Sequence, residues 1–113
     1  MQVGRLRPCP KAYTQFAWSH HVTVPATPGC YALVTYAGIV LYVGLASSSI
    51  ADRMAVHLET ESKRKGTPDG VPFWLYYFEC RASEVNAIER GWMNQSILAD
   101  GEMPPLNKVY SPL

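Results

Sequence analysis

The chain has 113 residues, a length that suits one compact domain. Hydrophobic residues make up 48% and charged residues 17%, which is enough apolar material for a packed core and argues against a disordered chain. A formal net charge of +1 excludes the strongly basic composition of a dedicated nucleic-acid binder. The longest uncharged apolar run, residues 71–78, is far shorter than the roughly 20 residues that span a membrane. With no secretory signal visible, we expect a cytoplasmic protein without a membrane partner.

The first part of the chain, residues 1–28, is predicted to be a lead-in that packs on a domain formed by residues 29–113. The lead-in carries prolines at positions 8, 10, 25 and 28 and mixes aromatic with polar residues, so its local structure is weakly specified.

A β-hairpin is predicted directly after the lead-in. Residues 30–36 and 39–43 are rich in β-branched and aromatic residues, and Ala37-Gly38 between them is typical of a two-residue turn. Neither run alternates cleanly between polar and apolar residues. We therefore expect both faces of the sheet to be covered.

The hairpin brings two tyrosines together. With Ala37-Gly38 as the turn, Tyr31 lies opposite Gly44 and Leu33 lies opposite Tyr42. Because alternate side chains share a face, Tyr31 and Tyr42 become diagonal neighbours roughly 7 Å apart. Gly44 has no side chain to fill the space in front of Tyr31. Such a tyrosine pair is by itself typical of ordinary cross-strand packing.

Two helices and a third strand complete the predicted elements. A serine-capped helix is expected from Ser47 to about Ser62, followed by a loop over residues 63–70. Residues 71–80 have high β-propensity, and a second helix is expected from a cap at Ser83 to Asp100, with Gly101 at its stop. This order favours an α+β fold, a small antiparallel sheet with helices packed on it.

The first helix carries an arginine and a histidine on one side. Arg53 and His57 are four residues apart and flank the apolar stripe of residues 50, 54 and 58, so we expect both at the rim of the helix–sheet interface. Each residue alone is typical of an ordinary boundary side chain.

The second helix carries a carboxylate in its apolar face. Glu89 falls within the arc formed by Val85, Ile88, Trp92 and Met93. A carboxylate rarely enters a buried face unless it is paired or binds a metal. The alternatives are a metal site and a structural salt bridge to an arginine.

These residues, in this order, resemble the GIY-YIG nuclease family. The family's two name tripeptides match Gly29-Cys30-Tyr31 and Tyr42-Val43-Gly44, and the further matches are Arg53, His57, Glu89 and Asn107. Cys30 stands where the family usually has isoleucine, and the interval from Gly44 to Arg53 is one residue longer than is common. The resemblance implies a three-stranded antiparallel sheet flanked by helices.

The resemblance also implies a divalent-metal-dependent endonuclease that hydrolyses phosphodiester bonds in DNA. By this resemblance Glu89 would hold a single Mg²⁺ or Mn²⁺ ion, which keeps water ligands and accepts phosphate oxygens readily. Arg53 would hold the scissile phosphate with its fork of donors.

The remaining matches imply roles in activating the attacking water. Tyr31 would activate the water with help from Tyr42, provided that a cation favours its phenolate, because a free phenol has a pKa of about 10. His57 is the alternative base. Asn107 would fix the substrate or a tyrosine.

Two other functions stay open. The first is a nucleic-acid-binding module that does not cleave, and the second is a generic α+β domain in which these residues only pack. The basic triplet Lys63, Arg64 and Lys65 is predicted to contact backbone phosphate. No zinc-finger spacing, helix-turn-helix signature or long basic helix is visible in the sequence. We therefore expect either a compact standalone nuclease of a phage or bacterium, or one that depends on a homodimer or a separate partner for targeting.

Overall fold

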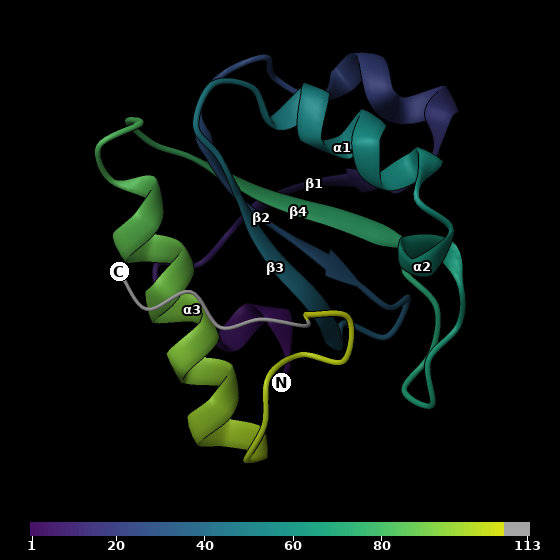
Figure 1. Ribbon diagram of the computed structural model, residues 1–113, viewed down its shortest axis with the longest axis vertical. Coiled ribbons are helices and arrows are strands. Elements are labelled where there is room, and N and C mark those ends of the chain that lie inside the picture. Colours follow the sequence, from purple (N-terminus) through teal and green to yellow (C-terminus); the bar gives the residue numbers. More distant parts are fainter. Residues whose placement is uncertain (108–113) are drawn as a thin grey trace.

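The computed structural model describes residues 1–107 and contains a sheet with helices on both of its faces (Figure 1). The strands are β1 (Ala12–Gln15), β2 (Gly29–Val34), β3 (Val40–Ala46) and β4 (Trp74–Glu79). The α-helices are α1 (Ile50–Glu59), α2 (Glu61–Arg64) and α3 (Val85–Asp100), and two short 3-10 helices, η1 (Val3–Arg5) and η2 (Trp18–Thr23), lie in the first part of the chain. The predicted α+β class is confirmed.

The sheet has four antiparallel strands in the order β1-β4-β2-β3, so the expected count of three is corrected. The three predicted strands are β2, β3 and β4. The fourth strand, β1, comes from the lead-in and pairs with β4, with Tyr13 opposite Tyr76. Only four residues long, β1 is too short for a recognisable alternation, and it forms because β4 offers an unpaired edge.

The hairpin register is confirmed at the tyrosines. Tyr31 is opposite Gly44, and Leu33 is opposite Tyr42. The predicted two-residue turn is wrong, however. The connection is a three-residue loop over residues 36–38, and an extra residue in β3 then restores the register.

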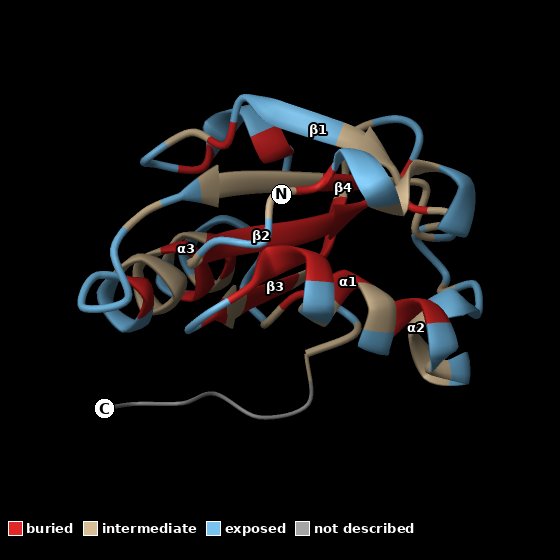
Figure 2. Ribbon diagram, turned by 90° about the horizontal axis from the view of Figure 1, so that it is seen from above, coloured by how far each residue is buried: buried red, intermediate tan, exposed pale blue. Residues whose placement is uncertain are grey.

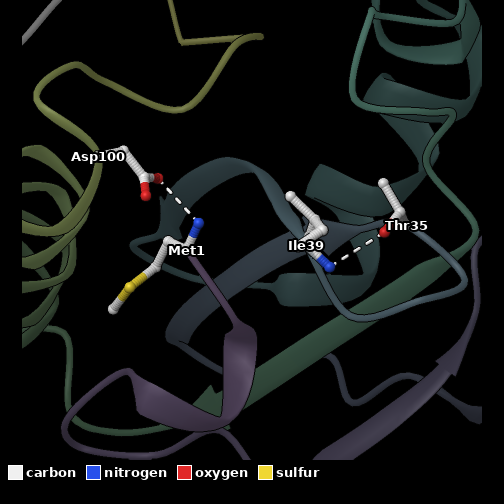
Figure 3. Close-up of polar contacts among 4 residues, drawn as sticks. All are labelled: Met1, Thr35, Ile39 and Asp100. Atoms are coloured by element: carbon white, nitrogen blue, oxygen red, sulfur yellow. Dashed lines mark hydrogen bonds and ion pairs between the residues drawn. The ribbon is translucent and has the colours of Figure 1, made fainter.

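The loop is held by hydrogen bonds between its two ends. The Thr35 amide donates to the Ile39 carbonyl at 2.9 Å, and the Ile39 amide donates to Thr35 Oγ1 at 3.0 Å (Figure 3). Gly38 has a φ of +96°, a left-handed conformation that favours glycine. A three-residue loop with glycine at its left-handed position is the next most common hairpin after the two-residue turn.

Each face of the sheet contributes to a separate hydrophobic cluster, which confirms the expectation of cover on both sides (Figure 2). One face packs against α1 through residues that include Tyr31, Leu33, Leu75, Ile50 and Met54. The opposite face packs against α3 and the start of the chain through residues that include Val3, Leu6, Ala32, Val43, Trp92 and Met93. The sheet is therefore the middle layer, and the two faces see different helices.

The helix boundaries differ from the predicted ones. The first helix begins at Ile50, where Ser49 Oγ accepts from the Asp52 amide at 3.1 Å, and it breaks at Thr60 before the short α2. The second long helix, α3, begins after Glu84, one residue later than expected from a Ser83 cap. Before α1, serine occupies the three neighbouring positions 47–49, so the sequence leaves the capping residue of that helix ambiguous.

The end of α3 lies as predicted. Gly101 follows Asp100 with a φ of +79°, and its amide donates to the Ile97 carbonyl at 2.7 Å. The Met1 ammonium group pairs with the Asp100 carboxylate at 2.8 Å, which joins the start of the chain to this helix end (Figure 3). None of the helices within residues 1–107 combines the length and apolarity needed to cross a membrane.

Candidate active site

A cavity of about 370 Å³ opens where β3 ends and α1 begins. Its lining comes from four elements and one loop. Tyr31 belongs to β2, residues 42 and 44–46 to β3, and residues 47–49 to the serine loop. Asp52 and Arg53 come from α1, and Glu89 comes from α3. Glu89 belongs to the helix on the opposite face of the sheet. It reaches the cavity because β3 is an edge strand, so the two faces meet there.

Tyr31 and His57 form a buried polar pair beneath the cavity. The Tyr31 side chain is fully buried, His57 is 3% exposed, and 2.6 Å separates Tyr31 Oη from His57 Nε2. Burial raises the pKa of Tyr31, and the nearby Arg53 only partly opposes that effect. Burial, together with the positive charges of Arg53 and Lys63, lowers the pKa of His57 to about 4. Both groups are therefore neutral at neutral pH, and Tyr31 can donate to Nε2 when the imidazole proton is on Nδ1.

Tyr42 completes an aromatic group around His57. Its ring centroid lies 6.2 Å from that of Tyr31 and 5.0 Å from that of His57, which it meets edge to face. Lys63 Nζ lies 4.6 Å from the Tyr42 ring centroid, within the range of a cation–π contact. Burial raises the pKa of Tyr42, so this phenol is also protonated at neutral pH.

Gly44 is required by the closeness of Tyr31. A Cβ atom at this position would lie 2.6 Å from Tyr31 Cζ and Oη and 2.9 Å from Tyr42 Cε2. The strand register predicted an open space at Gly44, opposite Tyr31. The Tyr31 ring occupies that space.

Arg53 lines the cavity beside Tyr31. Its polar contact with the Tyr31 phenol raises the pKa of Arg53, while burial opposes the rise. Arg53 Nε is buried and has no hydrogen-bond partner among residues 1–107. The guanidinium thus has donor capacity left for an anion in the cavity.

Glu89 is half-buried and lines the cavity from α3. Its carboxylate forms no hydrogen bond or ion pair within residues 1–107, so the structural salt bridge that the sequence left open is not found in that part of the chain. Burial raises the pKa of Glu89, and the neighbouring Arg90 partly opposes the rise.

Asn107 lies outside the cavity, where it extends the edge of β3. Its Oδ1 accepts from the Val43 amide at 2.9 Å, and its Nδ2 donates to the Val43 carbonyl at 3.0 Å. Both polar atoms of the Asn107 side chain therefore hydrogen-bond to the backbone of Val43, the residue between Tyr42 and Gly44. Within the structure Asn107 therefore acts on the position of β3, next to Tyr42, and the role toward a substrate that the resemblance implied stays a prediction.

The basic triplet lies at the end of α2, and its members have different surroundings. Lys63 lies over Tyr42, whereas Arg64 is exposed. Lys65 forms an exposed ion pair with Glu61 at 3.2 Å. Only Lys63 is thus next to the candidate site.

Asp52 and the three serines at positions 47–49 line the cavity but were not predicted as site residues. A carboxylate three residues after a serine cap is typical of an ordinary helix start. The first amides of α1 are already used, because those of Ile50, Ala51 and Asp52 donate to Thr27, Pro25 and Ser49. The start of α1 therefore offers side chains to the cavity, with no free backbone donors among these three.

Four of the predicted residues, Tyr31, Tyr42, Arg53 and Glu89, line one cavity, and His57 supports it from beneath. Among residues 1–107, no three His, Cys, Asp or Glu side chains cluster closely enough to hold a metal by themselves. No protein-family model matches the chain, and no curated protein matches it significantly.

Proposed function

We propose that the chain is a divalent-metal-dependent endonuclease of the GIY-YIG type that hydrolyses phosphodiester bonds in DNA. The observation that carries the proposal is the neutral Tyr31–His57 pair, 2.6 Å apart, beneath a cavity that also holds Arg53 and the carboxylate of Glu89, which has no partner among residues 1–107. The β4-β2-β3 part of the sheet would correspond to the three strands of that family.

The Tyr31–His57 pair supports a proton relay. As water attacks phosphorus, its proton passes to Tyr31 Oη while the phenol proton passes to His57 Nε2. The new P–O bond forms, the bond to the leaving oxygen breaks, and that oxygen takes a proton from solvent. Tyr31 stays neutral throughout, so the relay avoids a buried phenolate, whose formation the raised pKa opposes.

A bound phosphate would also make His57 a better base. The positive charges of Arg53 and Lys63 contribute to the low pKa of His57. A phosphate anion held by Arg53 offsets those charges, so the pKa of His57 rises when substrate is bound. His57 therefore becomes a stronger base only when the substrate is bound.

Arg53 and Glu89 stabilise negative charge in the cavity in different ways, Arg53 by donating hydrogen bonds and Glu89 by holding a metal ion. The Arg53 guanidinium, with its buried unpartnered Nε, donates to phosphate oxygens as negative charge develops on them. Glu89 is an oxygen donor without a partner in residues 1–107, which fits Mg²⁺ or Mn²⁺ with the remaining positions taken by water and phosphate. Such an ion supplies Lewis-acid stabilisation of the phosphate charge.

The test is cleavage of supercoiled plasmid with Mg²⁺ or Mn²⁺. Glu89→Gln and Tyr31→Phe keep the size of the side chains and should each slow nicking by about a hundredfold or more. Glu59→Gln is the matched control, because Glu59 is exposed at the end of α1 and does not line the cavity; it should nick at the wild-type rate.

Two outcomes decide against the proposal. Equal nicking by the wild type and Glu89→Gln would assign the activity to a contaminant. DNA binding without nicking, across linear, supercoiled, single-stranded and branched substrates, would establish the non-cleaving module instead. RNA belongs in the same panel, because Arg53 and Glu89 would act on a phosphate group that DNA and RNA share.

A further inference from the structure

A group of aromatic side chains lies on the α3-side face of the sheet, away from the cavity. We call Tyr13, Tyr36, Phe73, Trp74 and Tyr76 the aromatic platform. Tyr13 comes from the edge strand β1, Trp74 and Tyr76 from β4, and Tyr36 from the β2–β3 loop. Figure 2 shows how exposed β1 is at this edge. Tyr13 is 56% exposed and Tyr36 74% exposed, unusually high values for aromatic side chains that touch several other rings.

The platform has two layers. Tyr13 stacks on Tyr76 with ring centroids 4.8 Å apart and an interplanar angle of 22°, and Tyr36 stacks on Trp74 at 5.9 Å and 27°. Each outer tyrosine therefore stacks on a β4 ring while more than half of its surface stays exposed.

Contacts between the two layers hold the rings in place. Trp74 meets Tyr13 edge to face at 5.5 Å, and Trp74 Nε1 donates to the Tyr36 carbonyl at 3.3 Å. Phe73 meets both Tyr36 and Trp74 edge to face, at 5.0 Å and 4.6 Å. The two exposed tyrosine rings are thus held in place before any ligand binds, which lowers the entropy cost of stacking a planar group on them.

Positive charges stand near both ends of the platform. Lys11 is exposed and comes directly before β1, two residues from Tyr13. Arg5 is exposed at the end of η1, whose first residue Val3 donates to the Gly38 carbonyl in the loop that carries Tyr36. Carboxylates lie at the same two ends: that of Asp69 in the groove beside Tyr36 and Phe73, and that of Glu79 in the groove that Lys11 lines.

We propose that the aromatic platform binds single-stranded nucleic acid by stacking bases on Tyr13 and Tyr36, with Arg5 and Lys11 contacting the backbone phosphates. Unpaired bases offer open faces to such rings, whereas the bases of a duplex stack on one another. Arg5 and Lys11 give such a strand phosphate contacts, which an apolar or proline-rich peptide would not use. This surface goes beyond the proposed cleavage site, because it lies on the opposite face of the sheet from α1 and includes none of the cavity residues.

The test is fluorescence anisotropy with a labelled oligothymidine of about ten nucleotides, in EDTA so that no metal-dependent cleavage occurs. Tyr13→Ala and Tyr36→Ala should each weaken binding about tenfold, whereas Tyr13→Phe should bind as the wild type does, because the ring is what stacks. Trp18→Ala is the matched control, since Trp18 is 50% exposed on η2 and its only ring contact within residues 1–107 is with His21. It should have no effect. Changing Arg5 and Lys11 together to glutamine should reduce the salt dependence of binding.

Several results would overturn the proposal: no binding by the wild type, equal binding by the alanine variants, or tighter binding of a duplex of the same length. A proline-rich peptide that binds the wild type and displaces the oligonucleotide only when Tyr13 is intact would reassign the platform to a protein partner. Oligonucleotide binding is measured in EDTA with platform variants, whereas plasmid nicking needs the metal and is tested with cavity variants. A failure of plasmid nicking therefore leaves this result unaffected, and a failure of oligonucleotide binding leaves the nicking result unaffected.

Discussion

The buried His57 predicts a loss of stability in mild acid. In the folded protein its pKa is lowered from 6.5 to about 4, because burial and the charges of Arg53 and Lys63 disfavour the imidazolium. In the unfolded chain this histidine takes up a proton near its ordinary pKa. Between the two values the unfolded state therefore binds more protons, and the free energy of unfolding falls as the pH falls.

The size of the effect follows from the same two pKa values. The contribution of His57 is fully present above 6.5 and is lost progressively toward pH 4. Each pH unit in that window removes about 1.4 kcal/mol, so a change from pH 7 to pH 5 should remove about 2 kcal/mol. For a domain of this size, that corresponds to roughly a 10 °C lower Tm.

The assay is urea unfolding at several pH values between 5 and 7, with His57→Gln as the variant that no longer titrates. The variant should be less stable at pH 7 and should lose much less stability on acidification than the wild type. His20→Gln is the matched control, because His20 lies outside the core, and it should show the wild-type pH dependence. If the unfolding free energies of the wild type and His57→Gln change equally with pH, the claim that a neutral, buried His57 underlies the site is refuted.

Three further predictions concern the supports of the site. Gly44→Ala should destabilise the fold by about 1–3 kcal/mol and abolish nicking, because its Cβ would lie 2.6 Å from the Tyr31 ring; wild-type activity in this variant would contradict the observed packing. Asn107→Ala removes both hydrogen bonds to Val43 and should lower the unfolding free energy by about 1–2 kcal/mol, measured by urea unfolding. Lys63→Gln removes one of the charges that lower the pKa of His57, so an NMR titration should give a higher value; an unchanged pKa would exclude that electrostatic contact.

The predictions that held depend on local geometry. The pairing of Tyr31 with Gly44 follows from strand alternation across a short connection. The pairing was predicted correctly although the turn was not, because a bulge in β3 compensates for the longer loop. Arg53 and His57 lie four residues apart in one helix, so their shared side was determined before any packing was known.

The expectations that changed depend on contacts between distant segments. Strand β1 forms because it pairs with the otherwise free edge of β4. Its four residues are too few for a recognisable strand alternation in the sequence. The hydrogen bonds between the Asn107 amide and the backbone of Val43 likewise could not be predicted, because no spacing rule indicates that partner. The outer tyrosines of the aromatic platform come from β1 and the β2–β3 loop, so their stacking is visible only after folding.

By itself, the sequence determined which side chains share a strand face or a helix side, because those relations follow from backbone periods of two and 3.6 residues. Only the tertiary structure decided that Glu89, on the helix of the opposite layer, lines the same cavity as Arg53, and that Tyr31 and His57 are buried enough to be neutral. The physical reason is that cavities and pKa shifts arise from how layers pack and exclude water, and packing joins residues whose separation along the chain carries no periodic signal.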